Sequence, residues 1–144
     1  MRLYLDNCLF NRPYDDQSDI LIRLETEAKL QIQQIIRDGQ HPLIWSYILD
    51  YENARNPYGD RSTQIGAWRR YAEIDVTESF ELLQRAKAFN QLGLKKMDAL
   101  HLACAVAAEA DAFLTTDKGI LKKAPVVKSV RIQNPIDFLR EQSL

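Results

Sequence analysis

The alternation of short apolar runs with helical patterns limits the fold of this chain more than any other feature. Each run ends beside polar or turn-forming residues, and amphipathic stretches lie between the runs. We expect strands over residues 3–5, 42–45, 112–115 and 130–132. Strands that alternate with helices favour an α/β domain whose mostly parallel sheet is covered by helices on both faces.

Apolar residues spaced three and four apart predict the helices. From Ile20 to Ile35 this spacing indicates an amphipathic helix, and Gly39 is expected to end it. A stripe of small and apolar residues from Ala99 to Ala110 predicts a helix that packs closely against the sheet. We expect further helices, or single helical turns, over residues 47–55, 64–72, 77–93, 120–123 and 135–139.

Length and charge narrow the class of protein. A chain of 144 residues with 46% hydrophobic content can form one buried core, so we expect a single domain over residues 1–144. The net charge of -1 means that any binding of nucleic acid must be local. Asp6 interrupts the N-terminal apolar run, and no later run approaches the ~20 residues of a membrane span. Cys8 and Cys104 match no redox or zinc pattern. We therefore expect a cytoplasmic protein without a membrane segment.

Four acidic residues are expected near one edge of the sheet. Asp6 directly follows the first predicted strand, and Asp117 comes after the third. Asp98 opens the small-residue helix, and Glu52 lies six residues after Ser46 on the helix that follows the second strand. Ligands of parallel α/β sheets bind beyond the carboxyl ends of the strands. The four carboxylates can therefore share one site.

Such a group of carboxylates suits the hydrolysis of a phosphodiester. Carboxylate oxygens are hard ligands that bind Mg²⁺ or Mn²⁺, and such an ion lowers the pKa of a bound water and stabilises the leaving oxygen. Without an ion the carboxylates repel one another, so at least one should have a raised pKa.

A structural role is the alternative for each acidic residue. Asp6, Asp98 and Asp117 all precede predicted helices, where aspartate is a preferred N-cap that contributes roughly 1 kcal/mol. Glu52 alone could be an ordinary solvated helix residue. The chain has 20 acidic residues, and residue pattern alone leaves both interpretations open.

The sequence around these residues resembles the PIN-domain family, and in particular its bacterial VapC-type ribonucleases. Four blocks occur in the family's order along nearly the whole chain. They are LYLDN at 3–7 with NRP at 11–13, SYILDYE at 46–52, DALHLA at 98–103 and LTTDK at 114–118. Asn7 departs from the Thr or Ser of many members.

The resemblance implies a PIN-like three-layer sandwich and a Mg²⁺- or Mn²⁺-dependent endoribonuclease. In small bacterial members it most often implies the toxin of a type II toxin–antitoxin pair, with RNA as substrate and an antitoxin protein as partner. It makes Asp6, Asp98 and Asp117 metal ligands and catalytic residues, and Glu52 either a ligand or the residue that positions the attacking water. The identity of the RNA, the number of ions and the formation of a homodimer stay open.

Two other functions remain as alternatives. One is a PIN-domain nuclease that acts in RNA processing without an antitoxin. The other is a non-catalytic α/β binding module, although the four intact carboxylates argue against it. A short antitoxin reading frame beside the gene would separate the toxin from the processing nuclease.

Several neighbours of the acidic residues are secondary candidates. Asn7 and Thr115 are expected close to the carboxylates, because the alternation of strand side chains puts Thr115, rather than Thr116, on the side of Asp117. His101 lies on the same helix face as Asp98, but we expect a packed histidine rather than a ligand, since the site favours oxygen donors. Aromatic residues that could stack on bases are Trp68 and Tyr71, whereas Trp45 is expected in the core.

Overall fold

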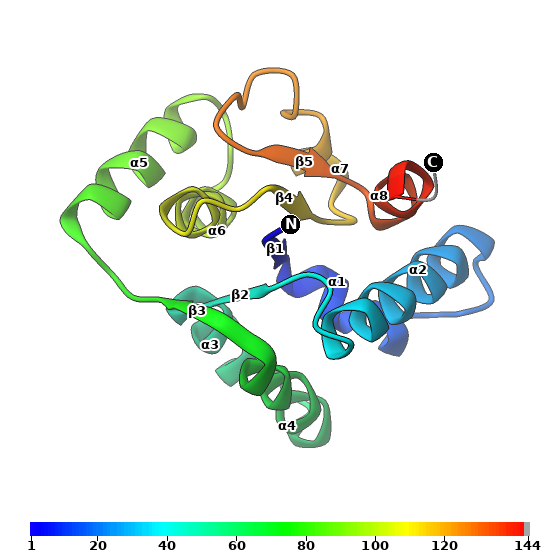
Figure 1. Ribbon diagram of the computed structural model, residues 1–144. Coiled ribbons are helices and arrows are strands. Elements are labelled where there is room, and N and C mark those ends of the chain that lie inside the picture. The colour runs from blue at the N-terminus through cyan, green and yellow to red at the C-terminus, as the bar shows by residue number, and fades with distance from the viewer. Residues whose placement is uncertain (143–144) are drawn as a thin grey trace.

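A five-stranded parallel sheet forms the centre of the molecule (Figure 1). The computed structural model describes residues 1–142. The strand order is β3-β2-β1-β4-β5, so β1 is central and β3 and β5 are the edges. The strands are β1 (Leu3–Leu5), β2 (Leu43–Ser46), β3 (Ala72–Val76), β4 (Ala112–Leu114) and β5 (Arg131–Gln133). This confirms the predicted α/β class.

Helices cover both faces of the sheet, which gives three layers. In Figure 1, α5 and α6 lie on one side and α2 and α8 on the other. None of the described helices is long and apolar enough to cross a membrane. The helices are α1 (Asn7–Asn11), α2 (Ile20–Arg37), α3 (Tyr47–Ala54), α4 (Gly59–Gly66), α5 (Phe80–Gln91), α6 (Lys96–Ala107), α7 (Lys118–Leu121) and α8 (Pro135–Gln142), with 3-10 turns η1 (Arg12–Tyr14) and η2 (Ala67–Tyr71).

The core lies where the central strands meet the helices. All residues of β1 are fully buried, as are Phe113 of β4 and Trp45 of β2, which confirms the expected place of Trp45. On α6, Ala99 and Ala103 are buried, so small side chains let this helix approach the sheet closely. The central strands therefore hold the sheet edge, and any side chain just beyond it, in a fixed position.

Local signals set several helix ends. Asp19 caps α2 by accepting hydrogen bonds from the backbone of Leu21 and Ile22, and Gly39, with a φ of 77°, follows its last turn. The predicted end of α2 at Gly39 is thus confirmed. Helix α5 starts at Phe80 rather than near Thr77, because Ser79 supplies the cap, and this corrects our expected boundary.

The sequence prediction missed strand β3. Residues 64–72 were expected to be helical, but α4 ends at Gly66, a 3-10 turn follows, and the strand runs over Ala72–Val76. Its Ile74 pairs with Ile44 of β2, while Glu73 and Asp75 are exposed. Charged side chains on the solvent side of an edge strand weaken the apolar signal and also prevent pairing with other chains. Pairing with β2, a non-local contact, decides the conformation of this segment.

Candidate metal centre

Asp6 lies at the carboxyl edge of the sheet, directly after central strand β1. Its backbone N–H donates to Leu114 O of β4 at 2.9 Å, so the chain leaves the sheet only at this residue. The residue is only 4% exposed. One carboxylate oxygen accepts from Asn7 N at 2.8 Å and caps α1, and the other accepts from Thr115 Oγ1 at 2.8 Å and Cys8 Sγ at 3.2 Å. The position of this carboxylate is therefore fixed by its surroundings.

Glu52 and His101 complete a compact group with Asp6. Helix α3, capped by Ser46, carries Glu52 to the edge, and α6 carries the fully buried His101. His101 Nε2 hydrogen-bonds to Glu52 Oε1 and lies 3.9 Å from Asp6 Oδ1. One ligand atom from each of the three residues lies within 4.8 Å of the other two. Three segments far apart in sequence thus meet where a cation could bind.

A buried hydrogen-bond chain orients His101. The Tyr4 hydroxyl lies 2.6 Å from His101 Nδ1 and 2.7 Å from Ser46 Oγ. Burial raises the pKa of Tyr4 well above its ordinary value, so this phenol keeps its proton. The Tyr4 hydroxyl can then donate to His101 Nδ1 and accept from Ser46 Oγ, which leaves the Nε2–H of His101 to donate to Glu52 Oε1. This series of hydrogen bonds therefore holds one oxygen of Glu52 in place.

The charges of the other carboxylates contribute to the raised pKa of Asp98. Burial, and then the charges of Asp6, Asp117 and Glu52, raise the pKa of Asp98 to about 6. One carboxyl thus has a raised pKa, as predicted, but burial contributes more to the shift than the repulsion from which we predicted it. Asp98 is the third residue of α6, whose N-cap is Lys95, so it does not cap this helix as the structural alternative supposed.

Asp117 has a structural role that leaves part of its carboxylate available. It caps α7, where Oδ1 accepts from Ile120 N at 3.1 Å, and its own backbone N–H donates to Thr115 Oγ1 at 3.0 Å. Within residues 1–142, Oδ2 of Asp117 forms no hydrogen bond. The capping interpretation therefore holds for Asp6 and Asp117, but in neither case does the cap use both oxygens.

Two neighbours of the acidic residues, Thr115 and His101, contact them directly. Thr115 contacts both Asp6 and Asp117, as predicted, whereas Thr116 donates to Cys8 Sγ. His101 is packed, as expected. It also hydrogen-bonds to Glu52 and lies near Asp6, a place in the site that we did not predict for it. Its spacing of three residues from Asp98 on one helix was the signal in the sequence.

The donor set fits a hard divalent cation. Carboxylate oxygens dominate it, with one imidazole nitrogen nearby. Cys8 lies close to Asp6, but burial raises the pKa of this thiol to about 12, so it stays protonated and offers no thiolate to a soft metal. Mg²⁺ and Mn²⁺ suit these residues better than a thiolate-bound metal does.

A cleft opens beside the acidic residues. It has a volume of about 540 Å³, and Glu52 and Asn7 are among its lining residues. Arg61 Cζ lies 4.0 Å from the ring centroid of Tyr58, and Arg55 Cζ lies 5.3 Å from that of Tyr51. The cleft therefore combines an acidic residue with guanidinium groups and aromatic rings.

Comparisons with known proteins give a likeness in structure. No family model matches the chain, and no curated protein is similar to it in sequence. The structure is similar to FitAcB from Neisseria gonorrhoeae, with a TM-score of 0.58, 15% identity and coverage of 92% of this chain and 97% of the other. It is also similar to VapBC2 from Rickettsia felis bound to promoter DNA, with a TM-score of 0.57 and 12% identity, and the match covers 93% of this chain and 98% of the other.

A third similar structure is VapBC-1 from nontypeable Haemophilus influenzae. Its TM-score is 0.56 at 15% identity, and the match covers 94% of this chain and 98% of that one. In each of the three, nearly the whole length of both chains is matched, so the likeness concerns the entire domain. The parallel sheet, its helical layers and these structural neighbours together establish a PIN-like α/β fold for this chain.

Proposed function

We propose that this chain is a Mg²⁺- or Mn²⁺-dependent endoribonuclease and the toxin of a toxin–antitoxin pair. The observation that supports it most is the compact group of Asp6, Glu52 and His101 at the sheet edge of a PIN-like fold, with Asp98 and Asp117 near enough to interact electrostatically. Helix caps need no such grouping, and the raised pKa of Asp98, caused first by burial and then by its acidic neighbours, favours a site that a cation would stabilise.

The metal ligands in this proposal are Asp6, Asp98 and Asp117, with Glu52 as a further ligand or as the residue that positions water. When bound, the ion supplies positive charge at the scissile phosphate and makes water a better nucleophile. The carboxylate of Asp6 is already oriented before an ion binds, because the α1 backbone and Thr115 each hydrogen-bond to one of its oxygens. Such a fixed position lowers the cost of assembling the site.

Glu52 is suited to hold the attacking water. Its Oε1 accepts from His101, and it is partly exposed to the cleft, so its other oxygen can accept a hydrogen bond from water. His101 and Tyr4 act as positioning residues, since they reach the reaction only through Glu52. Loss of the Tyr4 hydrogen bond should therefore lower the rate more than it lowers metal affinity.

The substrate in this proposal is RNA, which the cleft beside Glu52 can bind locally despite the net charge of -1. Arg55 and Arg61 provide positive charge for phosphates, and Tyr58 provides a ring on which a base can stack. Without an ion, the carboxylates repel the RNA backbone, so we expect metal to promote substrate binding as well as cleavage.

The antitoxin in this proposal covers the acidic edge. A partner that places an arginine among the four carboxylates would offer planar, paired hydrogen bonds and a charge that arginine does not lose. The VapBC names of two structural neighbours favour a paired system, and we extend this pairing to the present chain as part of the proposal.

The test is cleavage of a fluorescently labelled RNA with Mn²⁺, Mg²⁺ or excess EDTA. Asp6→Asn should abolish cleavage while the far-UV spectrum stays unchanged, because the substitution removes a ligand charge but keeps the size of the side chain. Glu27→Gln is the matched control, since Glu27 is an exposed carboxylate on α2. Cleavage by Asp6→Asn at the wild-type rate would refute the site.

Growth separates the toxin from a processing nuclease. Expression of the wild-type chain should stop growth, and co-expression with the protein of the adjacent upstream gene should restore it. If the active nuclease never slows growth and no neighbouring protein binds it, the RNA-processing nuclease is the correct account.

A further inference from the structure

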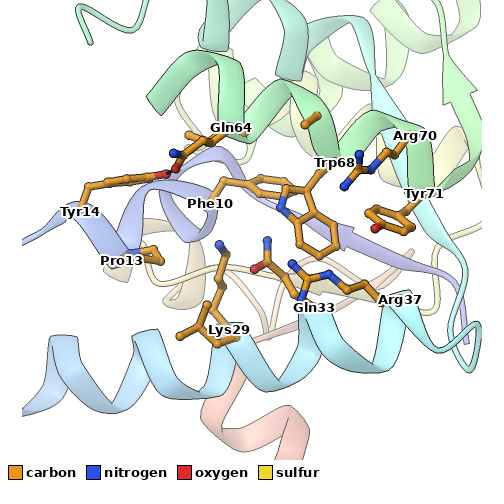
Figure 2. Close-up of a pocket in the computed structure, with 13 residues that line it drawn as sticks. Phe10, Pro13, Tyr14, Lys29, Gln33, Arg37, Gln64, Trp68, Arg70 and Tyr71 are labelled. Atoms are coloured by element: carbon orange, nitrogen blue, oxygen red, sulfur yellow. Dashed lines mark hydrogen bonds between the residues drawn. The ribbon is translucent and has the colours of Figure 1, made fainter. Parts of the chain in front are cut away.

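A second cavity lies apart from the acidic residues, between α2 and the η2 turn. Its volume is about 520 Å³, and none of the four carboxylates of the metal centre lines it. Lys29, Gln33 and Arg37 enter it from α2 at intervals of four residues, which places them on one helix face. Figure 2 shows these side chains extending from α2 toward the opposite wall, with Lys29 facing Phe10 and with Gln33 and Arg37 near Trp68.

Lys29 brings an unbalanced positive charge into this cavity. The residue is only 6% exposed, and its ammonium lies 5.8 Å from the ring centroid of Phe10. Burial, and then the charge of Arg37, lower the pKa of Lys29 to about 8, and no carboxylate within residues 1–142 pairs with it. A buried cation without a partner is costly, so an anion in the cavity would relieve a real penalty.

Gln33 provides a second unsatisfied donor at the same place. It is 3% exposed, and its side-chain Nε2 has no hydrogen-bond partner among the described residues. Buried donors without acceptors are rare in folded proteins because each loses its bonds to water. Gln33 lies between Lys29 and Arg37 on the helix face, so an acceptor that satisfies the amide would also lie near both cations.

Aromatic rings and arginines also line the cavity. Arg37 Cζ lies 4.8 Å from the Trp68 ring centroid, and Arg70 Cζ lies 5.0 Å from that of Tyr71. The two rings are 4.9 Å apart, which gives one wall a continuous aromatic surface. The cavity thus combines donors without acceptors, excess positive charge and flat rings.

We propose that this cavity binds a phosphate-bearing nucleotide, with the phosphate beside Lys29, Gln33 and Arg37 and the nucleoside against the aromatic wall. Phosphate has more acceptor oxygens and more negative charge than one carboxylate. It can therefore pair with Lys29, Arg37 and the Gln33 amide at the same time. The volume falls within the usual range for a small-molecule site. The phosphate can come from a free mononucleotide or from one residue of a bound RNA strand.

The experiment is calorimetric titration in EDTA, so that neither metal nor cleavage contributes. The probes are UMP, AMP, a short single-stranded RNA and an acidic peptide. Lys29→Met and Arg37→Gln each remove one cation, and Arg23→Met is the control, because Arg23 is exposed on the same helix outside the cavity. Lys29→Met should fold, since it removes a buried charge, and Arg37→Gln should fold because Arg37 is exposed, although it loses the contact with the Trp68 ring.

We expect saturable binding of a mononucleotide or of the RNA, weakened at least about tenfold by Lys29→Met and by Arg37→Gln and unchanged by Arg23→Met. Binding of the mononucleotide identifies a site for free nucleotides, and binding of RNA alone identifies a site for one nucleotide of a strand. The proposal is overturned if neither binds, if the cavity variants bind as the wild type does, or if only the acidic peptide shows the variant pattern. None of these results depends on ribonuclease activity.

Discussion

Asp98→Asn tests whether the acidic group is costly without metal, as a functional site would be. The folded-state pKa of Asp98 is raised from 3.8 to about 6, which corresponds to about 3 kcal/mol at ~1.4 kcal/mol per pKa unit. Because Asp98 is partly exposed, solvent screening reduces the expected effect to about 1–2 kcal/mol. Without metal and at neutral pH, the variant should therefore be more stable than the wild type by this amount.

The pH dependence of that difference follows from the direction of the shift. The folded protein binds more protons at Asp98 than the unfolded chain does between pH 3.8 and about 6. Stability from this residue is therefore fully present below the unfolded pKa and is lost as the pH rises through the folded pKa. The advantage of Asp98→Asn should therefore be absent below pH 3.8, grow as the pH rises and be complete above about pH 6.

Urea unfolding in EDTA over this pH range measures the difference in the free energy of unfolding between the variant and the wild type. The same unfolding curves in Mn²⁺ then test whether Asp98 binds the ion. Binding of Mn²⁺ to the folded state should stabilise the wild type and reverse the order of the two proteins, because the variant has lost one ligand. A variant that is less stable than the wild type at neutral pH in EDTA would refute the reasoning. It would then be correct to regard Asp98 as a structural residue.

Two further substitutions test other parts of the structure. The lowered pKa of Lys29 costs the folded state about 3 kcal/mol below about pH 8, so the stability of the wild type should rise between about pH 8 and 10.5. Lys29→Met should remove this rise. Urea unfolding curves in which the variant and the wild type depend on pH in the same way would contradict the prediction. Tyr4→Phe should destabilise the fold by about 1–2 kcal/mol and lower the cleavage rate while the Mn²⁺ affinity is kept. An equal loss of rate and affinity would show that His101 acts on the metal ligands themselves.

Local patterns in the sequence determined the fold class and the order of the main elements. Buried runs such as Leu3–Leu5 and Ala112–Leu114 are apolar on both faces, and α2 has both an apolar stripe and a cap at Asp19. These signals act between residues that are close along the chain, so a single sequence contains them. The prediction that Asp6 and Asp117 lie at the carboxyl edge of the sheet rests on the same kind of signal, since both follow apolar strands.

Only the tertiary structure decided which distant residues meet. Strand β3 exists because it pairs with β2, and its charged, half-exposed sequence is too weak a signal by itself. Tyr4 and His101 are 97 positions apart, and Glu52 and His101 are 49 apart, so no local spacing predicts their hydrogen bonds. The charge on Lys29 looks ordinary in the sequence and becomes costly only when α1, α2 and η2 enclose it. Burial and pairing depend on the packing of the whole chain, and therefore the functional meaning of these residues does too.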